Sequence, residues 1–485
     1  RWTAMPEQAP PSVPSKVPSD VPPNLPLAVI GAGPAGLAAV AVARRHGIEA
    51  ALLDEQSGPG GQIYRGIGNA DPDSMAVLGD EYVQGRELLP VVNDPGRHDL
   101  YGAMVWQITA DGAIYYSREG KAAALRAEHI ILAAGAIERP MPIPGWTLPG
   151  VMTAGAGQTL LKSGGLVPQG PLVLAGSGPL LWLLAAQYGR AGVNIAALVE
   201  TTPRVNYHQA AFKLPGLLRE GELLRQGQAL RRELKRLGMP HFKNARGLHA
   251  IGDGYLRALR FTANGRLQEL ACDLLLLHMG VTPNVQFTRA LDLPHDWDEV
   301  QRCWLPRSET GGKTAIAGIR LAGDGAGIVG ARAAALQGRL AALVVAQELG
   351  CEAAAGEIAA TGEELRRRLA ARPFVDRLFA PGEEFLDPHD DTIICRCEEI
   401  TAARIRDLAG QGCRDANQLK AFGRPGMGPC QGRMCGLSVA EVLARAHAMP
   451  VAEAGYFRLR WPIKPVPMDE LSDFSEPEIE AGDDS

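Results

Sequence analysis

Two stretches of the chain repeat one design, and this repeat constrains the fold more than any other feature. PLAVIGAGPAGLAAVAVA (26–43) and PLVLAGSGPLLWLLAAQYG (171–189) each pass from an apolar run through a Gly-rich turn into an Ala- and Leu-rich segment. Each is followed, after a glycine, by a second apolar run, HGIEAALLDE (46–55) or AGVNIAALVE (191–200). Strand, helix and strand in this order predict the core of a doubly wound parallel sheet, present twice. The expected fold class is therefore α/β.

The same two stretches lack charge over nearly the length of a membrane span. Gly and Pro interrupt both at the same offset from a short apolar run, which a buried strand turning into a buried helix explains better. We therefore expect no transmembrane segment. At 485 residues, with 46% hydrophobic and 21% charged residues, the chain is expected to form two or three globular domains.

Charge and cysteine usage narrow the class of protein. The net charge is −5 without a broad basic footprint, so nucleic acid is not an expected partner. Five of the eight cysteines crowd into residues 395–435, which favours metal ligation in a reducing compartment over a disulfide framework. The Pro-rich segment 1–26 lacks the apolar core of a signal peptide; we expect it to be disordered, with Met5 as the natural initiator.

The first Gly-rich turn, GAGPAG, has the spacing of a dinucleotide-binding fingerprint. Gly31 allows the tight turn, Gly33 lets the backbone approach a pyrophosphate, and Gly36 lets helix and strand pack closely. Asp54 ends the next strand, where a carboxylate can accept a hydrogen bond from a ribose hydroxyl, and the adjacent Glu55 is the alternative. The candidate cofactor-binding residues of this region are Gly31, Gly33, Pro34, Ala35, Gly36, Asp54 and Glu55.

Three further segments complete a resemblance to a known family. They are PGGQIYR (59–65), AAGAIERP (133–140) and AGDGAG (322–327). Together with GAGPAG, these segments resemble the motifs of the flavoproteins with two dinucleotide-binding domains, and the four motifs follow one another in the order found in that family. The family includes glutathione and thioredoxin reductases and many FAD-dependent amine dehydrogenases. The resemblance covers residues 27 to about 345 and implies FAD in the first unit, with the GGQ turn near the flavin ring. The residues it adds to the cofactor site are Gly61, Gln62, Arg65, Ala134, Gly135, Gly323 and Asp324.

One departure from the disulfide reductases of that family is informative. No cysteine lies between the first strand and residue 271. A dithiol beside the flavin is therefore absent, and dithiol relay chemistry is excluded.

The second Gly-rich turn is altered. It reads GSGPLL, so that Leu181 stands where the third glycine of the fingerprint is expected. Glu200 ends the following strand, as a ribose ligand should. Two interpretations remain open: a working NADH site, or a retained domain that binds a nucleotide (NAD or ATP) weakly, structurally or not at all. The lost glycine favours the second interpretation.

The C-terminal cysteines form the pattern C-x-C-x32-C-x4-C, made by Cys395, Cys397, Cys430 and Cys435. Four thiolates in two close pairs suit a [2Fe–2S] cluster or a four-cysteine zinc site. Zinc pairs are usually spaced C-x2-C to C-x4-C, so the C-x-C pair favours the cluster. The glycines around the second pair predict backbone N–H groups near the sulfurs, which tune a redox cluster. Cys413 is interpreted as a buried thiol that is not a ligand.

CRCEEIT (395–401) and GPCQGRMCG (428–436) resemble the small helical [2Fe–2S] domain of bacterioferritin-associated ferredoxin. The x4 spacing of the second pair matches the form of this domain found in amine-dehydrogenase subunits. Including the tail YFRLRWPIKPVP, residues 27–467 resemble the FAD-containing α subunits of heteromeric, dye-linked amino-acid dehydrogenases. This family includes opine oxidases and D-hydroxyproline dehydrogenase and, more distantly, hydrogen cyanide synthase and sarcosine oxidase.

The resemblance implies a division of labour between subunits. A flavoprotein β subunit, with a small γ subunit in some members, would oxidise the amine, and this chain would pass electrons to a quinone or dye-like acceptor. It also allows an FMN at a subunit interface and a cytoplasmic location, at the inner face of the membrane. No constellation of His, Arg or Tyr predicts a catalytic site in this chain. Two rival interpretations are a stand-alone NAD(P)H-dependent ferredoxin or nitrite reductase-like flavoprotein and a zinc-stabilised scaffold subunit.

The expected domain order follows from these motifs. The first unit is split by the second, and a charged, helix-rich linker precedes the cysteine domain. The expected boundaries are 1–26 for the N-terminal segment, 27–150 and 291–349 for the FAD-binding domain, 151–290 for the second unit, 350–385 for the linker, 386–450 for the [2Fe–2S] domain and 451–485 for a C-terminal extension with an acidic tail.

Overall fold

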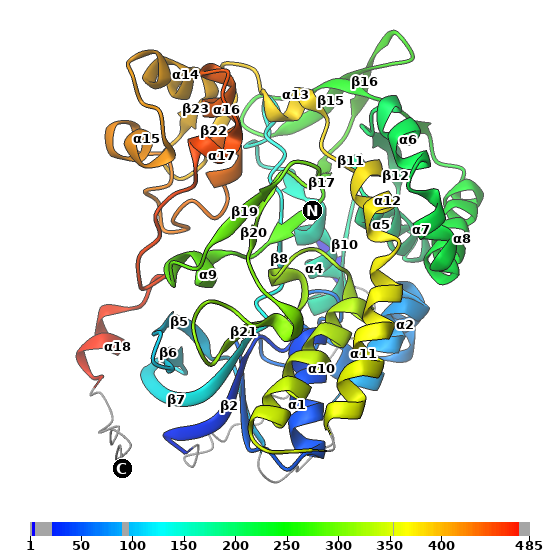
Figure 1. Cartoon of the computed structure of the whole chain (residues 1–485). Helices are drawn as coiled ribbons and strands as arrows, with labels where there is room; N and C mark the ends of the chain where they lie inside the picture. The colour runs from blue at the N-terminus through cyan, green and yellow to red at the C-terminus, as the bar shows by residue number, and fades with distance from the viewer. Residues whose placement is uncertain (1, 5–21, 90–96, 353, 475–485) are drawn as a thin grey trace.

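The structure is a computed structural model, and it describes residues 2–4, 22–89, 97–352 and 354–474. Two units built on parallel sheets occupy the lower part and the upper right of Figure 1, and a small helical domain occupies the upper left. The two-unit α/β fold and the helical C-terminal domain confirm the predicted fold class.

The first unit contains five parallel strands in the order β4-β3-β2-β7-β21. Their bounds are Arg97–Tyr101 (β4), Ala50–Asp54 (β3), Asn24–Ile30 (β2), Lys121–Leu132 (β7) and Ile319–Leu321 (β21). Two antiparallel strands, β5 (Met104–Ile108) and β6 (Ala113–Arg118), pair along the first half of β7. Strand β7 therefore belongs to both the parallel sheet and the meander.

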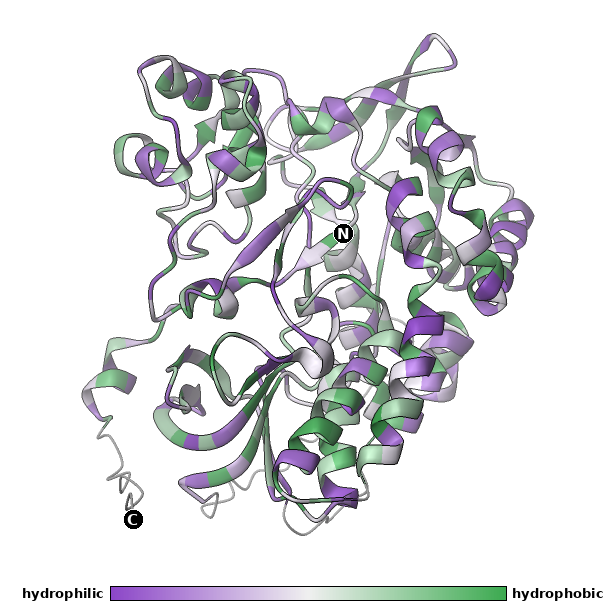
Figure 2. Cartoon of the chain, viewed as in Figure 1, coloured by the Kyte–Doolittle hydropathy of each residue, from purple (hydrophilic) through white to green (hydrophobic). Residues whose placement is uncertain are grey.

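Both faces of this sheet are covered. Leu27 and Val29 face the helices α1 (Pro34–Arg45) and α10 (Ala331–Glu348), which appear largely hydrophobic in Figure 2. Ala28 and Ile30 face the opposite side, where the meander and α9 (Gln286–Ala290) pack. This alternation within an apolar run is the side-chain period of a strand buried on both sides.

The second unit repeats this plan. Its parallel strands are arranged in the order β13-β12-β11-β17-β9, and a separate antiparallel meander contains β14, β15 and β16. The parallel strands are His241–Phe242 (β13), Ile195–Glu200 (β12), Leu172–Ser177 (β11), Leu274–Met279 (β17) and Val151–Thr153 (β9), and the meander strands are Arg246–Gly252, Leu256–Ala263 and Arg266–Ala271. The internal duplication predicted from sequence is confirmed.

Helices flank the second sheet. One face is covered by α4 (Ala154–Gly164), α5 (Pro179–Arg190) and α8 (Gly221–Leu237), with α2 (Pro72–Leu78) of the first unit beside α5. The other outer helices are α6 (Arg204–Ala211) and α7 (Leu214–Arg219). Both α1 and α5 begin with a proline, which is favoured at the first helical position because its missing N–H would have no partner there.

Short elements join the parts. The antiparallel pair β8 (Ala136–Glu138) and β18 (Val281–Pro283) connects the two units, and β19 (His295–Asp298) with β20 (Cys303–Pro306) forms a hairpin beside the small domain. Single helical turns are Asp80–Val83 (α3), Ile67–Asn69 (η1), Gln84–Leu88 (η2), Thr310–Gly312 (η3) and Gly323–Gly325 (η4).

The segment predicted as a linker contains α11 (Ala354–Leu369), α12 (Arg372–Leu378) and α13 (Glu383–Leu386). It is packed rather than free: α11 lies along α10, and α12 lies against α6 of the second unit. Phe385, at its end, belongs to the core of the second unit. The linker therefore crosses from one unit to the other as part of the globular structure.

The small domain contains β22 (Ile393–Cys395), β23 (Ile400–Thr401), α14 (Ala402–Gly410), α15 (Ala416–Gly423), α16 (Gly436–Ala446) and α17 (Val451–Ala454). After Gly455 the chain returns to the first unit. Ile463 is buried in the core of that unit, and its N–H donates to the Trp106 carbonyl at 3.0 Å. The extension ends with α18 (Met468–Ser472), beside β7.

The N-terminal segment departs from the expected disorder at both of its ends. Trp2–Ala4 forms β1, which pairs antiparallel with β10 (Leu166–Pro168), and Asn24 already begins β2. Strand pairing satisfies the backbone groups of these residues, which a Pro-rich composition alone does not predict. Residues 5–21, including Met5, and the acidic segment 475–485 lie outside the described residues. In the described part of the chain, no helix is long and apolar enough to span a bilayer.

Candidate functional site

The first Gly-rich turn joins β2 to α1 and brings three segments into close contact. A Cβ on Gly31, whose φ is +107°, would lie 2.4 Å from the Ala133 carbonyl oxygen. A Cβ on Gly36 would lie 1.8 Å from the Gly31 carbonyl oxygen. Neither position has room for a side chain, so backbone alone forms this part of the turn, and α1 begins directly after it with Pro34 and Ala35. This geometry fits a pyrophosphate.

The two carboxylates at the end of β3 have different surroundings. Asp54 accepts from the N–H groups of Ala32 at 2.5 Å and Gln56 at 2.7 Å, so both of its oxygens brace the turn. Burial raises the pKa of Asp54 in spite of these donors. Glu55 keeps 46% of its side chain exposed and forms an ion pair with Lys464 of the C-terminal extension. Of the two carboxylates, Glu55 is therefore the one whose oxygens do not brace the turn.

The GGQ turn lies against the first turn. A Cβ on Gly61, at φ +57°, would lie 2.8 Å from the Gly33 Cα. Arg65 donates to the side-chain oxygens of Gln56 and Gln62. Lys162, from α4 of the second unit, donates to the Ile63 carbonyl at 2.7 Å and the Gln62 carbonyl at 3.2 Å. Burial lowers the pKa of Lys162 to about 7. The turn is thus fastened from both units.

The return segment completes the site. Asp324 accepts from the N–H groups of Val329 at 2.8 Å and Gly330 at 2.9 Å, one residue after Gly323 in η4. The chain at Ala134 and Gly135 is held by Asn284, whose backbone N–H donates to the Gly135 carbonyl at 3.0 Å. The predicted site residues of the four motifs therefore lie on adjoining turns of one unit.

Sequence reasoning missed Gln286, two residues after Asn284. It is 1% exposed, and neither atom of its side-chain amide has a hydrogen-bond partner. A buried amide without partners is costly unless a ligand satisfies it. Together with the turns that lack room for a Cβ, this orphaned amide fits a large polar cofactor such as FAD. No sequence motif includes Gln286, and its burial without hydrogen-bond partners is visible only in the structure.

The second Gly-rich turn faces a side chain instead of free space. Gly176 pairs with His278 across β11 and β17, and in the first unit Gly31 lies against Ala133, one residue beyond the last pair of β2 and β7. His278 thus takes the place of an alanine, and its ring atoms would lie 3.0 Å from a Cβ on Gly178. The His278 Nδ1 and the Glu138 carboxylate are 2.5 Å apart, and both side chains are largely buried. Leu181 is fully buried beneath the turn.

The carboxylate predicted as the ribose ligand of the second unit, Glu200, is bound by side chains of the protein itself. Glu200 is 1% exposed and accepts from Trp182 Nε1 at 2.9 Å, and its other oxygen is 2.5 Å from His241 Nε2. The linker covers this region, because Asn206 donates to the Leu378 and Ala380 carbonyls and the Phe379 ring packs edge-on against Trp182. Protein side chains therefore contact both the second Gly-rich turn and the carboxylate that ends the following strand.

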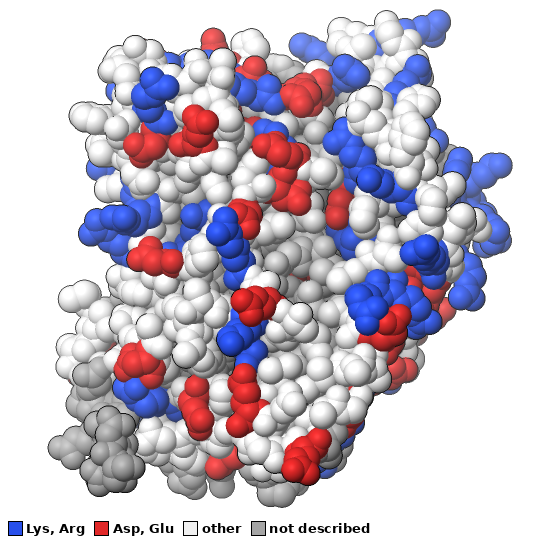
Figure 3. Space-filling model, viewed as in Figure 1, with Lys and Arg blue, Asp and Glu red and all other residues white. Residues whose placement is uncertain are grey.

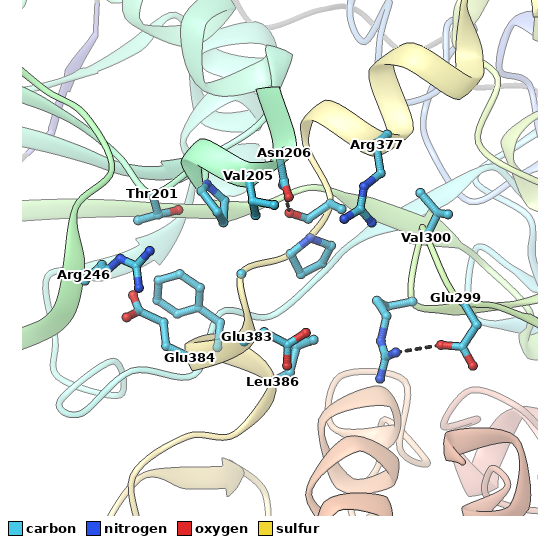
Figure 4. Close-up of a pocket in the computed structure, with 16 residues that line it drawn as sticks. Thr201, Val205, Asn206, Arg246, Glu299, Val300, Arg377, Glu383, Glu384 and Leu386 are labelled. Carbon is cyan, nitrogen blue, oxygen red and sulfur yellow. Dashed lines mark hydrogen bonds and ion pairs between the residues drawn. The ribbon is translucent and has the colours of Figure 1, made fainter. Parts of the chain in front are cut away.

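A pocket remains beside the linker, between α6, α13 and the β19–β20 turn (Figure 4). Asn206 points to the linker backbone, and Glu299 pairs with Arg302 at 2.7 Å. Arg302 also holds the buried Glu441 of the small domain through two hydrogen bonds, at 2.7 and 2.5 Å. Arg302 is thus shared between a pocket residue and the small domain, and it helps to dock that domain beside the pocket.

The four predicted metal-ligating cysteines lie on two loops of the small domain that face each other. Cys395 interacts with Cys435, and Cys397 with Cys430, through their thiols. The Cys435 contact, with backbone N–H groups of Gly426, Glu398 and Cys397, lowers the pKa of Cys395 to about 6 although burial opposes this. A Cβ on Gly428 would lie 2.8 Å from the Cys397 sulfur, so glycine keeps the loops close.

This donor set fits an iron–sulfur cluster or zinc in its chemistry. Within the described ranges, no three His, Cys, Asp or Glu side chains form a group that could hold a metal ion as they stand. Cys413 is buried at the turn after α14, where its carbonyl lies 2.8 Å from His447 Nε2. Arg396, between the first two cysteines, lies over the Trp146 ring at 5.3 Å.

The cysteine loop is tied to the first unit through the C-terminal extension. Gln431 donates to the Pro462 carbonyl at 2.6 Å and Arg433 to the Ile463 carbonyl at 3.3 Å. The next residue, Lys464, pairs with Glu55. On the other side, the Arg289 guanidinium lies between the rings of Trp304 and Tyr456, at 4.5 and 5.4 Å. The two candidate sites are thus linked by a continuous set of contacts.

Comparison with protein families matches residues 25–350 to "Pyridine nucleotide-disulphide oxidoreductase" and residues 390–473 to "Sarcosine oxidase A3 domain". The chain is 39% identical to the A subunit of opine oxidase from Agrobacterium tumefaciens (strain Ach5), over 92% of this chain and 91% of that protein. It is 32% identical to hydrogen cyanide synthase subunit HcnB of Pseudomonas protegens (strain DSM 19095 / LMG 27888 / CFBP 6595 / CHA0), over 90% of this chain and 96% of that protein.

Among solved structures, L-proline dehydrogenase from P. horikoshii superimposes with a TM-score of 0.67 at 19% identity. The match covers 92% of this chain and 79% of that chain. At this identity the likeness shows the fold alone.

Proposed function

The chain belongs to the pyridine nucleotide-disulphide oxidoreductase family and, within it, to the group of the opine oxidase A subunits, and on this basis we propose that it is the electron-transfer subunit of a heteromeric opine or amino-acid dehydrogenase. It is a flavoprotein oxidoreductase subunit of the class that acts on CH–NH donors. A partner flavoprotein subunit would oxidise the secondary amine, and this chain would carry the electrons to a quinone or dye-like acceptor.

FAD supplies the electron-accepting ring of the first unit when it is bound. Gly31, Gly33 and Gly36 would let the backbone approach its pyrophosphate, and Glu55 would accept from its ribose. The GGQ turn and the amide of Gln286 would face the rest of the cofactor, with Asp324 at its ribityl or pyrophosphate region. The role of each residue is proposed from the motif positions and from the free space or free amide found there.

The closed second unit supports an electron source other than NAD(P)H. His278 lies against the turn, and Glu200 is engaged by Trp182 and His241. Binding of a nicotinamide dinucleotide in the usual place would have to displace these buried side chains and the linker. We therefore propose that this unit binds neither NAD nor ATP in that place and serves to hold the linker and the small domain.

Four thiols are proposed to hold a [2Fe–2S] cluster, with Cys395 and Cys397 on one loop and Cys430 and Cys435 on the other. The C-x-C spacing supports the cluster over zinc, because one intervening residue makes it hard for both sulfurs to wrap a single ion. The backbone N–H groups near Cys395 would stabilise negative charge on the ligand sulfurs. These are the contributions of the chain itself to the redox centre.

The observation that carries the proposal is the physical link between the two sites. Residues 462–464 contact the cysteine loop through Gln431 and Arg433 and the candidate ribose ligand through Lys464. A chain that only stabilised a scaffold would not need its two cofactor sites joined. An electron carrier does need them joined, because transfer requires two centres held at a fixed and short separation.

The assembly is proposed to contain the flavoprotein β subunit, a small γ subunit, and an FMN at a subunit interface, as the sequence resemblance implies. It would act in the cytoplasm at the inner face of the membrane, where a quinone-like acceptor is available. The names of the relatives are subunit names, and this supports a hetero-oligomer for the present chain.

Co-purification from the native cell tests the proposal. We expect a flavoprotein partner, and we expect the purified complex to reduce a dye when an opine or D-hydroxyproline is supplied. Iron and acid-labile sulfide in equal amounts, with an EPR signal after reduction, are expected for this chain. A protein that purifies alone and reduces the dye with NADH would support the stand-alone reductase instead, and stoichiometric zinc without iron would support the scaffold.

A further inference from the structure

The outer helical layer of the second unit has a surface composition that the proposed electron-transfer role does not explain. Residues 204–237, in α6, α7 and α8, contain eight basic and three acidic side chains, a net charge of +5 in a chain whose total is −5. The eight basic residues, all exposed, are Arg204, Lys213, Arg219, Arg225, Arg231, Arg232, Lys235 and Arg236. Lys and Arg gather over α7 and α8 at the right edge of Figure 3. We name residues 204–237 the basic helical face.

The three acidic side chains do not neutralise this charge, because each is paired with an arginine from another helix. Glu220 pairs with Arg368 of α11 at 2.5 Å, and Glu222 pairs with Arg368 at 2.8 Å and with Arg332 of α10. Glu233 pairs with Arg190 of α5 at 2.6 Å. In the part of the chain that the structure describes, none of the eight basic side chains forms an ion pair. The positive charge is therefore left for an anionic partner.

Large apolar side chains project from the same face. Phe212 is 84% exposed and Leu218 is 59% exposed, and Leu214 is also exposed. They are not the core-facing residues of these helices, because Leu217 and Leu234 fulfil that role and are buried. A residue as large as Phe212 in water, between Arg204 and Lys213, indicates a surface that is covered in the working protein.

The two properties together favour a lipid surface over other anionic partners. Protein interfaces are enriched in Arg, but their core is poor in charge, and here six arginines and two lysines have no ion-pair partner in the described part of the chain. A nucleic acid attracts cations through its phosphates, but Phe and Leu side chains that project from helices contribute little to that binding. A bilayer with anionic headgroups attracts clustered Lys and Arg and accepts a few apolar side chains at the acyl boundary.

We propose that the basic helical face docks on the surface of an anionic bilayer, with Phe212 and Leu218 inserted at the boundary between headgroups and acyl chains. This proposal rests on the placement at the inner face of the membrane proposed above, and it assigns that placement to a particular surface. Docking at this face would keep the complex beside a membrane-dissolved acceptor.

Vesicle co-sedimentation of the full, cofactor-containing chain tests the proposal without turnover. We expect at least roughly tenfold tighter binding to vesicles of phosphatidylglycerol and phosphatidylethanolamine than to vesicles of phosphatidylcholine, with the difference lost at high salt. The double variants Phe212→Ser/Leu218→Ser and Arg231→Glu/Arg232→Glu should each weaken binding by a similar factor. Their melting temperatures should stay within a few degrees of wild type, since all four side chains are exposed.

Matched controls separate this face from general surface properties. Leu267→Ser removes a leucine of β16 that is 70% exposed, and Arg366→Glu/Arg367→Glu reverses an adjacent arginine pair on α11. Neither should change vesicle binding. Equal binding to both vesicle types, or equal losses in controls and variants, would overturn the proposal. So would variants that bind vesicles normally but lose the partner subunit, or that lose only binding of a single-stranded oligonucleotide. None of these results would bear on whether the chain carries a cluster.

Discussion

The ring of His278 lies against Gly178, at the turn where the second unit would meet a pyrophosphate. In the first unit the matching place is taken by Ala133, opposite Gly31. The two units, which share one plan, therefore differ at this turn by a histidine in place of an alanine, in addition to Leu181 in place of the third glycine. The partner of His278 is Glu138, which also accepts from the Gly155 N–H at 2.7 Å.

Replacing His278 by Ala tests whether this side chain has a structural role. Removing it leaves the largely buried Glu138 without its imidazole partner and opens a cavity, so we expect a loss of about 2–4 kcal/mol in the free energy of unfolding. NADH binding should not appear in a fluorescence titration, because Trp182 and His241 still engage Glu200. His249→Ala, at an exposed position on β14, is the control and should be neutral. Tight NADH binding by the variant would show that one ring alone closes the site.

Gly36→Ala tests the cofactor turn. The added Cβ would overlap the Gly31 carbonyl oxygen at 1.8 Å and force α1 away from β2. We expect destabilisation of about 2–4 kcal/mol and a chain that loses most of its FAD on gel filtration, measured as flavin absorbance per protein. The control is Gly58→Ala, where no atom lies within 4 Å of the added Cβ. Full flavin occupancy in Gly36→Ala would place the cofactor elsewhere.

Sequence predicted the fold well because its signals are local. The repeated Gly-rich turns identify both units, and a Cβ at Gly31 or Gly36 meets backbone that is brought there by the strand–turn–helix pattern itself. For the ribose ligand of the first unit, the sequence indicated Asp54, with the adjacent Glu55 as the alternative. That choice depends on Lys464, which comes from the far end of the chain.

The sequence indicated only part of the difference between the second Gly-rich turn and a dinucleotide-binding turn. Leu181 indicated an altered turn, but the partners of Glu200 come from positions that no local pattern connects. The linker was predicted as a charged, helix-rich connector, and its contacts with Asn206 have no local signal because they form only in the folded chain. Aligning residues 129–135 with 274–280 would have revealed His278 at the place of Ala133.

The ion pair of Glu55 with Lys464 gives a pH dependence with a definite sign. Burial alone would raise the pKa of Glu55, but the charges of Lys464, Arg433 and Arg65 hold it below its ordinary value of 4.5. The stabilisation is therefore complete above pH 4.5 and is lost as the pH falls through the folded-state pKa. Since Glu55 is partly exposed, we expect about 0.5 kcal/mol.

Lys464→Met should remove this contribution. Hydrogen exchange in residues 456–474 should be faster than in wild type at about pH 7, and the difference should vanish at about pH 3. Lys121→Met, at an exposed position on β7, is the matched control. A difference that grows on acidification would mean that the pair is not what anchors the extension.

Cys397→Ser and Cys413→Ser separate a ligand from a packed thiol. We expect Cys397→Ser to lose the iron and the visible absorbance of the cluster, because three thiolates cannot complete the four-cysteine set. Cys413→Ser should keep both and lose about 1 kcal/mol of stability, since it replaces a buried thiol with a hydroxyl. Iron analysis and EPR after dithionite reduction measure the difference. Equal iron in the two variants would contradict the assignment of Cys397.

The most direct test of the central claim is an anaerobic comparison of electron donors, followed by flavin absorbance and by EPR on the same sample. With the isolated chain, NADH should neither bleach the flavin nor produce a reduced-cluster signal. When an opine and the partner flavoprotein are both present, the two signals should appear together. Bleaching of the isolated chain by NADH at a rate that supports turnover would contradict the account and make the second unit a working nucleotide site.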